Sequence, residues 1–80
     1  MEGTTVSRKF DPERLRALRL LAKMTQSKMA ERSGVPVDTY RDYEQGRAVP
    51  SVPRLFILAD TLGCSLDDLA SKLEESGDVA

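Results

Sequence analysis

The 80-residue sequence contains no histidine, no tryptophan and a single cysteine, Cys64. The missing histidine removes the commonest general base of enzymes. One cysteine without histidine leaves too few ligands for a zinc site, and it cannot form an internal disulfide. The sequence also lacks a glycine-rich phosphate loop and a nucleophile beside a base. These absences predict a protein that is not an enzyme and that uses neither a metal nor another cofactor.

Long apolar runs are absent as well. No stretch approaches the ~18 apolar residues that a membrane-spanning helix needs. Residues 1–10, MEGTTVSRKF, lack the apolar core of a signal peptide. Hydrophobic residues make up 40% of the chain and charged residues 31%, as in soluble globular domains. We therefore expect one small domain, located in the cytoplasm and without a membrane partner.

Positive charge is scarce in the last third of the sequence, although the net charge of the whole chain is only −1. Residues 1–54 hold 11 Lys or Arg against 7 Asp or Glu, a net charge of +4. Residues 55–80 hold 1 Lys against 6 Asp or Glu, a net charge of −5. The basic part favours a nucleic-acid partner, whereas the acidic part would repel DNA and is expected to serve another purpose.

The fold class follows from the spacing of the apolar residues. They recur at helical intervals, and runs of β-branched residues are absent, so an all-α fold is expected. Five helices are predicted, over residues 12–23, 26–33, 36–45, 52–62 and 66–73. Side chains suited to cap a helix N-terminus precede four of them: Asp11, Thr25, Ser51 and Ser65.

Two of these helices have apolar stripes that are expected to face the core. The stripe of the first helix consists of Leu15, Leu18, Leu21 and Ala22. That of the fourth consists of Leu55, Phe56, Leu58, Ala59 and Leu62. Residues 1–10 are expected to form a flexible arm, residues 11–73 the folded domain, and residues 74–80 a flexible tail.

The central stretch Gln26–Glu44, QSKMAERSGVPVDTYRDYE, is predicted to form a helix, a tight turn and a second helix. Ala30 is small enough to let the second helix approach the first. Gly34 lies at the turn, where the backbone needs a positive φ that glycine adopts without steric cost. Apolar and aromatic positions at Met29, Val35 and Tyr40 close the angle between the helices. This spacing is typical of the DNA-binding helix-turn-helix.

Several short strings extend this pattern along the chain. They are Leu-Arg at 18–19, Thr-Gln at 25–26, Met-Ala at 29–30, Ser-Gly-Val at 33–35, Tyr-Glu-Gln-Gly at 43–46, Pro-Ser at 50–51 and Leu-Gly-Cys-Ser-Leu-Asp-Asp-Leu at 62–69. Together they make the sequence resemble the Cro/cI-type helix-turn-helix family, the lambda-repressor-like or XRE-family domains, over about residues 13–73. The resemblance implies a compact five-helix fold that binds operator DNA, often as a two-fold dimer.

The resemblance also implies roles for single residues. Gln26, at the start of the second helix, would contact a phosphate and brace the recognition helix. Arg19 and Glu44 would form a structural ion pair between the first and third helices. The base-reading positions would be Val37, Asp38, Thr39, Arg41 and Asp42. The loop after the third helix, with Gln45, Gly46 and Arg47, would contact phosphates.

Some of these assignments have equally good alternatives. Lys28 lies in the first turn of its helix, where its charge opposes the helix dipole, so a nearby phosphate would give it a use. A solvated charge explains Lys28 equally well, and the same holds for Arg47. The apolar stripe of the last helix also has two interpretations. Part of it packs on the first and fourth helices, and a leftover patch of Leu66, Leu69 or Leu73 with Val52 would suit a homodimer across a two-fold axis.

The function that the resemblance implies is that of a transcriptional regulator, most simply a repressor that occupies double-stranded operator DNA. Asp38 and Asp42 depart from it, because they place carboxylates on the face that should approach a polyanion. The alternatives are an antitoxin that binds a toxin and a promoter, or a helix-turn-helix fold used to bind a protein partner. A continuous positive ridge through Lys28, Arg41 and Arg47 would favour DNA, whereas its interruption by the two aspartates would favour a protein.

Overall fold

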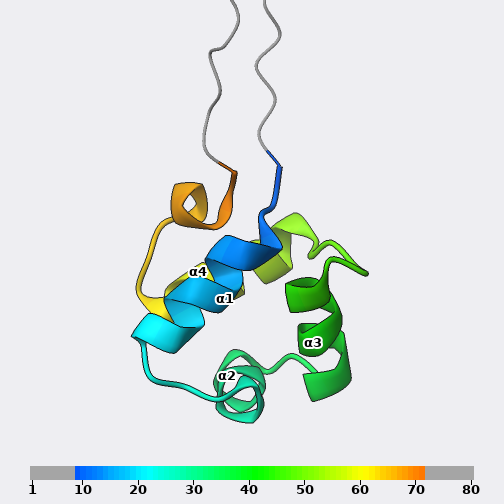
Figure 1. The fold of residues 1–80 in the computed structure, drawn as a ribbon, viewed down its shortest axis with the longest axis vertical. Coiled ribbons are helices and arrows are strands. Elements are labelled where there is room, and N and C mark those ends of the chain that lie inside the picture. The colour runs from blue at the N-terminus through cyan, green and yellow to red at the C-terminus, as the bar shows by residue number, and fades with distance from the viewer. Residues whose placement is uncertain (1–8, 72–80) are drawn as a thin grey trace, which may run out of the picture.

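The computed structural model describes residues 9–71 of the chain, which form a small bundle of helices (Figure 1). Its elements are α1 (Pro12–Leu21), α2 (Gln26–Ser33), α3 (Val37–Gln45), α4 (Val52–Leu62) and the 3-10 helix η1 (Leu66–Leu69). No strand occurs within residues 9–71, where the only β pairing is an isolated antiparallel bridge between Phe10 and Ala70. The predicted all-α class is confirmed, but the fifth helix is a single 3-10 turn.

The N-termini of the helices are fixed locally by their caps. Thr25 accepts a hydrogen bond from the backbone amide of Lys28, and Asp11 accepts one from that of Glu13. Ser51 and Ser65 cap α4 and η1 in the same way. All four predicted caps are therefore present. Such caps are worth about 1 kcal/mol each, because they satisfy amides that have no partner inside the helix.

The C-termini of the four α-helices share one geometry. In each, a residue with positive φ follows the helix, and the amide of the next residue reaches back five positions, as Met24 does to the Arg19 carbonyl at 3.2 Å. Glycine occupies the positive-φ position after α2, α3 and α4. After α1 the position is taken by Lys23, with a φ of 60°. The first helix ends at Leu21, close to Lys23 and before Met24 as predicted, because this turn closes it.

The core draws one fully buried large side chain from each element. These side chains are Leu15, Met29, Tyr40, Leu58 and Leu69. Three residues of the predicted stripes are exposed. Leu21 is 76% exposed, Phe56 is 52% exposed and Ala22 is exposed as well, so the expectation that these three face the core is wrong.

The short η1 results from pairing between the two ends of the described chain. Ser65 forms a capping box with Asp68, but the backbone becomes extended at Ala70. There the amide of Ser71 donates to the carbonyl of Lys9 at 2.7 Å. A helix continuing to residue 73 would break these bonds. Lys9 and the neighbouring Phe10, which we assigned to a flexible arm, are thus joined to the domain.

Candidate nucleic-acid interface

α2 and α3 form the helix-turn-helix unit; in Figure 1, α2 lies at the bottom of the molecule and α3 to its right. Gly34 adopts a φ of 76° and ends α2. The amide of Val35 then donates to the carbonyl of Ala30 at 3.1 Å. Ala30 and Val35 are 4% and 3% exposed, so the small residue and the apolar residue of the predicted motif both lie in the contact between the helices.

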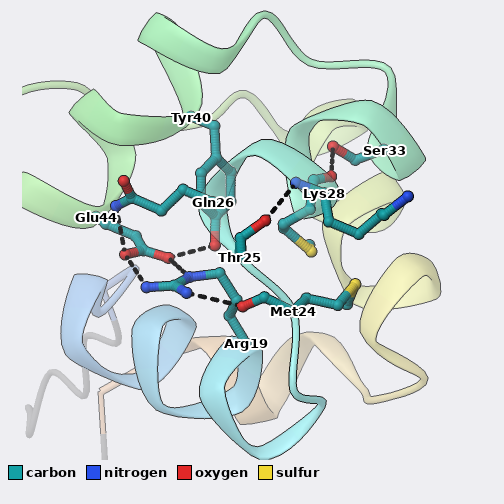
Figure 2. Close-up of polar contacts among 9 residues, drawn as sticks. Arg19, Met24, Thr25, Gln26, Lys28, Ser33, Tyr40 and Glu44 are labelled. Atoms are coloured by element: carbon teal, nitrogen blue, oxygen red, sulfur yellow. Dashed lines mark hydrogen bonds and ion pairs between the residues drawn. The ribbon is translucent and has the colours of Figure 1, made fainter.

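The carboxylate of Glu44, at the end of α3, joins three helices (Figure 2). Arg19 of α1 donates through Nε to Oε2 at 2.7 Å and through Nη2 to Oε1 at 3.2 Å. Gln26 of α2 donates through Nε2 to Oε1 at 3.0 Å. The hydroxyl of Tyr40, one helical turn earlier on α3, donates to Oε2. The remaining Arg19 nitrogen, Nη1, donates to the carbonyl of Met24 at 2.9 Å.

These contacts hold the charges of the cluster in one state. Burial alone would raise the pKa of Glu44, but the hydrogen bonds from Arg19, Tyr40 and Gln26 outweigh it and lower that pKa below the ordinary value of 4.5. Burial and the bond to Glu44 raise the pKa of Tyr40. The hydrogen bond between Arg19 and Glu44 likewise raises the pKa of Arg19. Near neutral pH the carboxylate is therefore ionised and the tyrosine remains a neutral donor.

The Glu44 cluster, which consists of Glu44 and its donors Arg19, Gln26 and Tyr40, explains how α3 is positioned. The ion pair of Arg19 and Glu44, expected from the family resemblance, is present and buried. Gln26 makes the expected brace to α3 through Glu44, while its contact with a phosphate stays a prediction. The hydrogen bond of Tyr40 was missed, although its spacing of four residues from Glu44 places the two side chains on one face of the helix.

The outer surface of α3 carries the side chains predicted to read bases. Asp38 and Arg41 form an ion pair there, with Oδ1 and Nη1 3.2 Å apart and side chains that are 91% and 47% exposed. Thr39 and Asp42 are half-buried. Val37 is half-buried as well and packs against the core, so it offers less surface than predicted.

The cations that flank this surface are also paired with carboxylates. Lys28 Nζ lies 3.2 Å from Glu31 Oε1, and Arg47 Nη1 lies 4.0 Å from Asp42 Oδ1. Gln45, the last residue of α3, and Arg47 are both exposed, as their predicted contact with phosphates requires. Each of the cations Lys28, Arg41 and Arg47 thus has an acidic neighbour, which partly offsets its positive charge.

The residues predicted for a dimer interface differ in exposure, as far as the structure describes them. Leu69 is only 1% exposed and belongs to the core, so its assignment to the interface is wrong. Leu66 is half-buried and packs against the core. Val52 is 61% exposed at the start of α4, and Phe56 lies one turn further along the helix. Leu73 lies outside the described residues.

Residues 9–71 present neither a metal site nor a membrane-spanning helix. No group of three His, Cys, Asp or Glu side chains within residues 9–71 is placed to hold a metal ion. None of the helices described is long and apolar enough to cross a membrane. The helix-turn-helix unit is thus the feature of residues 9–71 that points most directly to a function.

Comparison with known sequences places this unit in a family. Residues 15–69 match the helix-turn-helix family HTH_3, and the chain belongs to that family. It is 35% identical over 60 residues to the cryptic phage CTXphi transcriptional repressor RstR of Vibrio cholerae serotype O1. The match covers 75% of this chain and 54% of RstR, so the chain spans about half the length of that relative.

Comparison with solved structures gives the same fold in two settings. The restriction-modification controller protein C.AhdI from Aeromonas hydrophila is 28% identical with a TM-score of 0.70, over 72% of this chain and 88% of C.AhdI. HEPD of Streptomyces albus, solved with 2-hydroxyethylphosphonate and Fe(II), is 29% identical with a TM-score of 0.68. That match covers 72% of this chain but only 13% of HEPD, so it concerns a small part of that protein.

Proposed function

We propose that this protein is a sequence-specific DNA-binding transcriptional regulator that represses by occupying an operator. The observation that carries the proposal is a helix-turn-helix unit in a chain 35% identical over 60 residues to a transcriptional repressor. α3 would enter the major groove, because a single helix fits its width and can reach the base edges there. The Glu44 cluster supports this role, since it fixes α3 against α1 and α2 before any DNA is bound.

The contacts with DNA divide into two kinds. Gln26, Lys28, Gln45 and Arg47 would contact phosphates and set the register of the protein on the duplex. Asp38, Thr39, Arg41 and Asp42 would reach base edges, with Val37 at the margin. A homodimer would place two copies of α3 about 34 Å apart, one turn of DNA. Val52 is the one residue of the predicted dimer patch that is well exposed within residues 9–71.

Selection from a random duplex library, followed by affinity measurements over a salt series, tests the proposal. The wild type is expected to enrich a short palindrome, and its affinity should fall as salt rises because bound phosphates release counterions. Arg41→Ala should lose the enrichment while its thermal unfolding stays unchanged. Gln26→Ala should weaken binding to all sequences. Binding without enrichment, equal in the wild type and Arg41→Ala, would overturn the proposal.

A second candidate function is a protein-interaction module built on the same fold. The carboxylates beside Lys28, Arg41 and Arg47 favour it, because each one offsets a positive charge that would attract the phosphates of DNA. Absence of enrichment in the library, together with capture of a protein partner that Asp38→Asn or Asp42→Asn weakens, would support this reading. The antitoxin alternative combines both activities and has no observation of its own in its favour.

A further inference from the structure

Asp38 and Arg41 lie one turn apart on the outer surface of α3, and their ion pair does little for the fold. The side chains are 91% and 47% exposed, and a single contact of 3.2 Å joins them. Exposed pairs of this kind contribute about 0–1 kcal/mol to stability. The pair uses one nitrogen of the guanidinium, so most of its donors remain available. The arrangement is therefore better explained by what the surface binds.

The two side chains complement different bases. A guanidinium binds guanine through O6 and N7, whereas a carboxylate accepts a hydrogen bond from the N4 amino group of cytosine. Guanine and thymine present acceptors in the major groove that repel a carboxylate, and adenine presents N7 beside its amino group. Three residues along a helix correspond to about 4.5 Å, which is close to the spacing of ~3.4 Å between base pairs.

We propose that Asp38 and Arg41 act as one unit that reads a guanine and a cytosine on the same or adjacent base pairs, with Asp38 as a specificity-determining residue. On other sequences Arg41 stays paired with Asp38, because the carboxylate faces acceptors or phosphates and its repulsion offsets the attraction of the guanidinium. Asp38 thus lowers the affinity for random DNA more than the affinity for the operator. This inference rests on the proposed function.

The pair formed by Asp42 and Arg47 supports the same interpretation. It lies next along the chain and again places a carboxylate beside a cation that would approach DNA, with 4.0 Å between the charged atoms. A surface built for tight binding to any duplex would omit both carboxylates, since each one weakens the attraction for phosphates. Their presence is expected where discrimination between sequences matters more than affinity.

The experiment compares the wild-type chain, Asp38→Asn, Arg41→Ala and the double variant in selection from a random duplex library at one salt concentration. The wild type should enrich a site with a guanine and a cytosine. In Asp38→Asn the ratio of affinities for the site with and without the cytosine should fall about tenfold, which is within the range for one base contact. The same variant should bind random duplex several-fold more tightly. The double variant should lose little more discrimination than Arg41→Ala, because the two residues act together.

Glu31→Gln provides the matched control. Glu31 pairs with Lys28 at the same spacing of three residues and the same distance of 3.2 Å, but it lies on α2. Its removal deletes the same charge near the proposed DNA surface and should leave the base preference unchanged. Thermal unfolding of each variant confirms that the fold is intact.

The outcomes separate the inference from the proposed function. If the wild type and Asp38→Asn enrich the same site, and the ratio of their affinities for that site and for random duplex is equal, the inference is overturned and the proposed function stands. If Glu31→Gln loses the cytosine preference equally, the effect belongs to general charge and the inference is again overturned. If the wild type enriches no sequence, the proposed function fails and the inference fails with it.

Discussion

Two of the arginine–carboxylate pairs that involve α3 differ in almost everything except their chemistry. The pair of Arg19 and Glu44 has side chains that are 9% and 3% exposed, and the carboxylate accepts from two further donors. The pair of Arg41 and Asp38 lies in solvent and has one contact. The buried pair cannot be broken without leaving a charge unpartnered in the core. The exposed pair can exchange its partner for a ligand, so burial decides which pair positions the helix and which is available for binding.

The largest expected effect comes from breaking the buried pair. Glu44→Gln keeps the size of the side chain but leaves the guanidinium of Arg19 without its counter-charge. Loss of one partner of a buried pair costs about 3–5 kcal/mol, a large fraction of the stability of a small domain. Urea unfolding followed by circular dichroism measures it. Asp38→Asn is the matched change in the exposed pair, and an equal loss in both variants would remove the distinction drawn here.

Acid should weaken the buried pair selectively. The pKa of Glu44 is lower in the folded chain than its ordinary value of 4.5, so the folded state binds fewer protons than the unfolded state. Its contribution to stability is therefore complete above about pH 4.5 and is lost as the pH falls through the lower, folded value. Urea midpoints measured between neutral and acid pH should fall in this window. The fall in the urea midpoint should be smaller in Glu44→Gln. Hydrogen bonds with Ser65 lower the pKa of Asp68, so Asp68 should account for part of the fall that remains in this variant.

Removal of one of the groups that donate a hydrogen bond to Glu44 should have an intermediate effect on the free energy of unfolding. Tyr40→Phe leaves the ring in the core and deletes the hydroxyl that donates to Oε2, at an expected cost of about 1–2 kcal/mol. Tyr43→Phe is the matched control on the same helix, because its hydroxyl accepts a hydrogen bond from Arg54 at 3.1 Å and touches no carboxylate. Thermal unfolding of both variants measures the difference. A larger loss in Tyr43→Phe would contradict the importance assigned to the Glu44 cluster.

The smallest expected effect on folding is that of breaking the exposed pair. Arg41→Ala should change the free energy of unfolding by less than about 0.5 kcal/mol, because the side chain is 47% exposed and an exposed ion pair of this kind adds little to stability. The same urea measurement checks it. Unfolding at a markedly lower urea concentration would assign Arg41 a structural role and remove it from the binding surface.

The features that short-range rules determine could be predicted from the sequence. Thr25 and Ser65 cap their helices because a hydroxyl at that position accepts from an amide two or three residues later. Gly34 ends α2 because it tolerates a positive φ. The positive φ of Lys23 after α1 could not be predicted in the same way, since no glycine indicates it.

The features that depend on tertiary contacts could not be predicted. Leu21 and Phe56 have helical spacing but remain exposed, because spacing identifies a stripe and not the part of it that a neighbour covers. Leu69 was placed in an interface although it fills the core. The helix that contains Leu69 was predicted too long, because the chain that follows it pairs with Lys9 and Phe10, which are far away in the sequence. In the candidate site, the pairing of Arg19 with Glu44 was predicted from the family resemblance and not from the residues themselves.

The bridge between Phe10 and Ala70 brings the entry and the exit of the domain together, at the end of the molecule opposite α2 in Figure 1. A domain connected in this way can be inserted into another polypeptide, or extended on either side, without displacing the helix-turn-helix unit. The similar folds are consistent with this modularity, since they occupy 88% of one protein and 13% of another. A circular permutant joining residue 71 to residue 9 through a short glycine linker should accordingly retain the fold, because the joint spans a gap that hydrogen bonds already close.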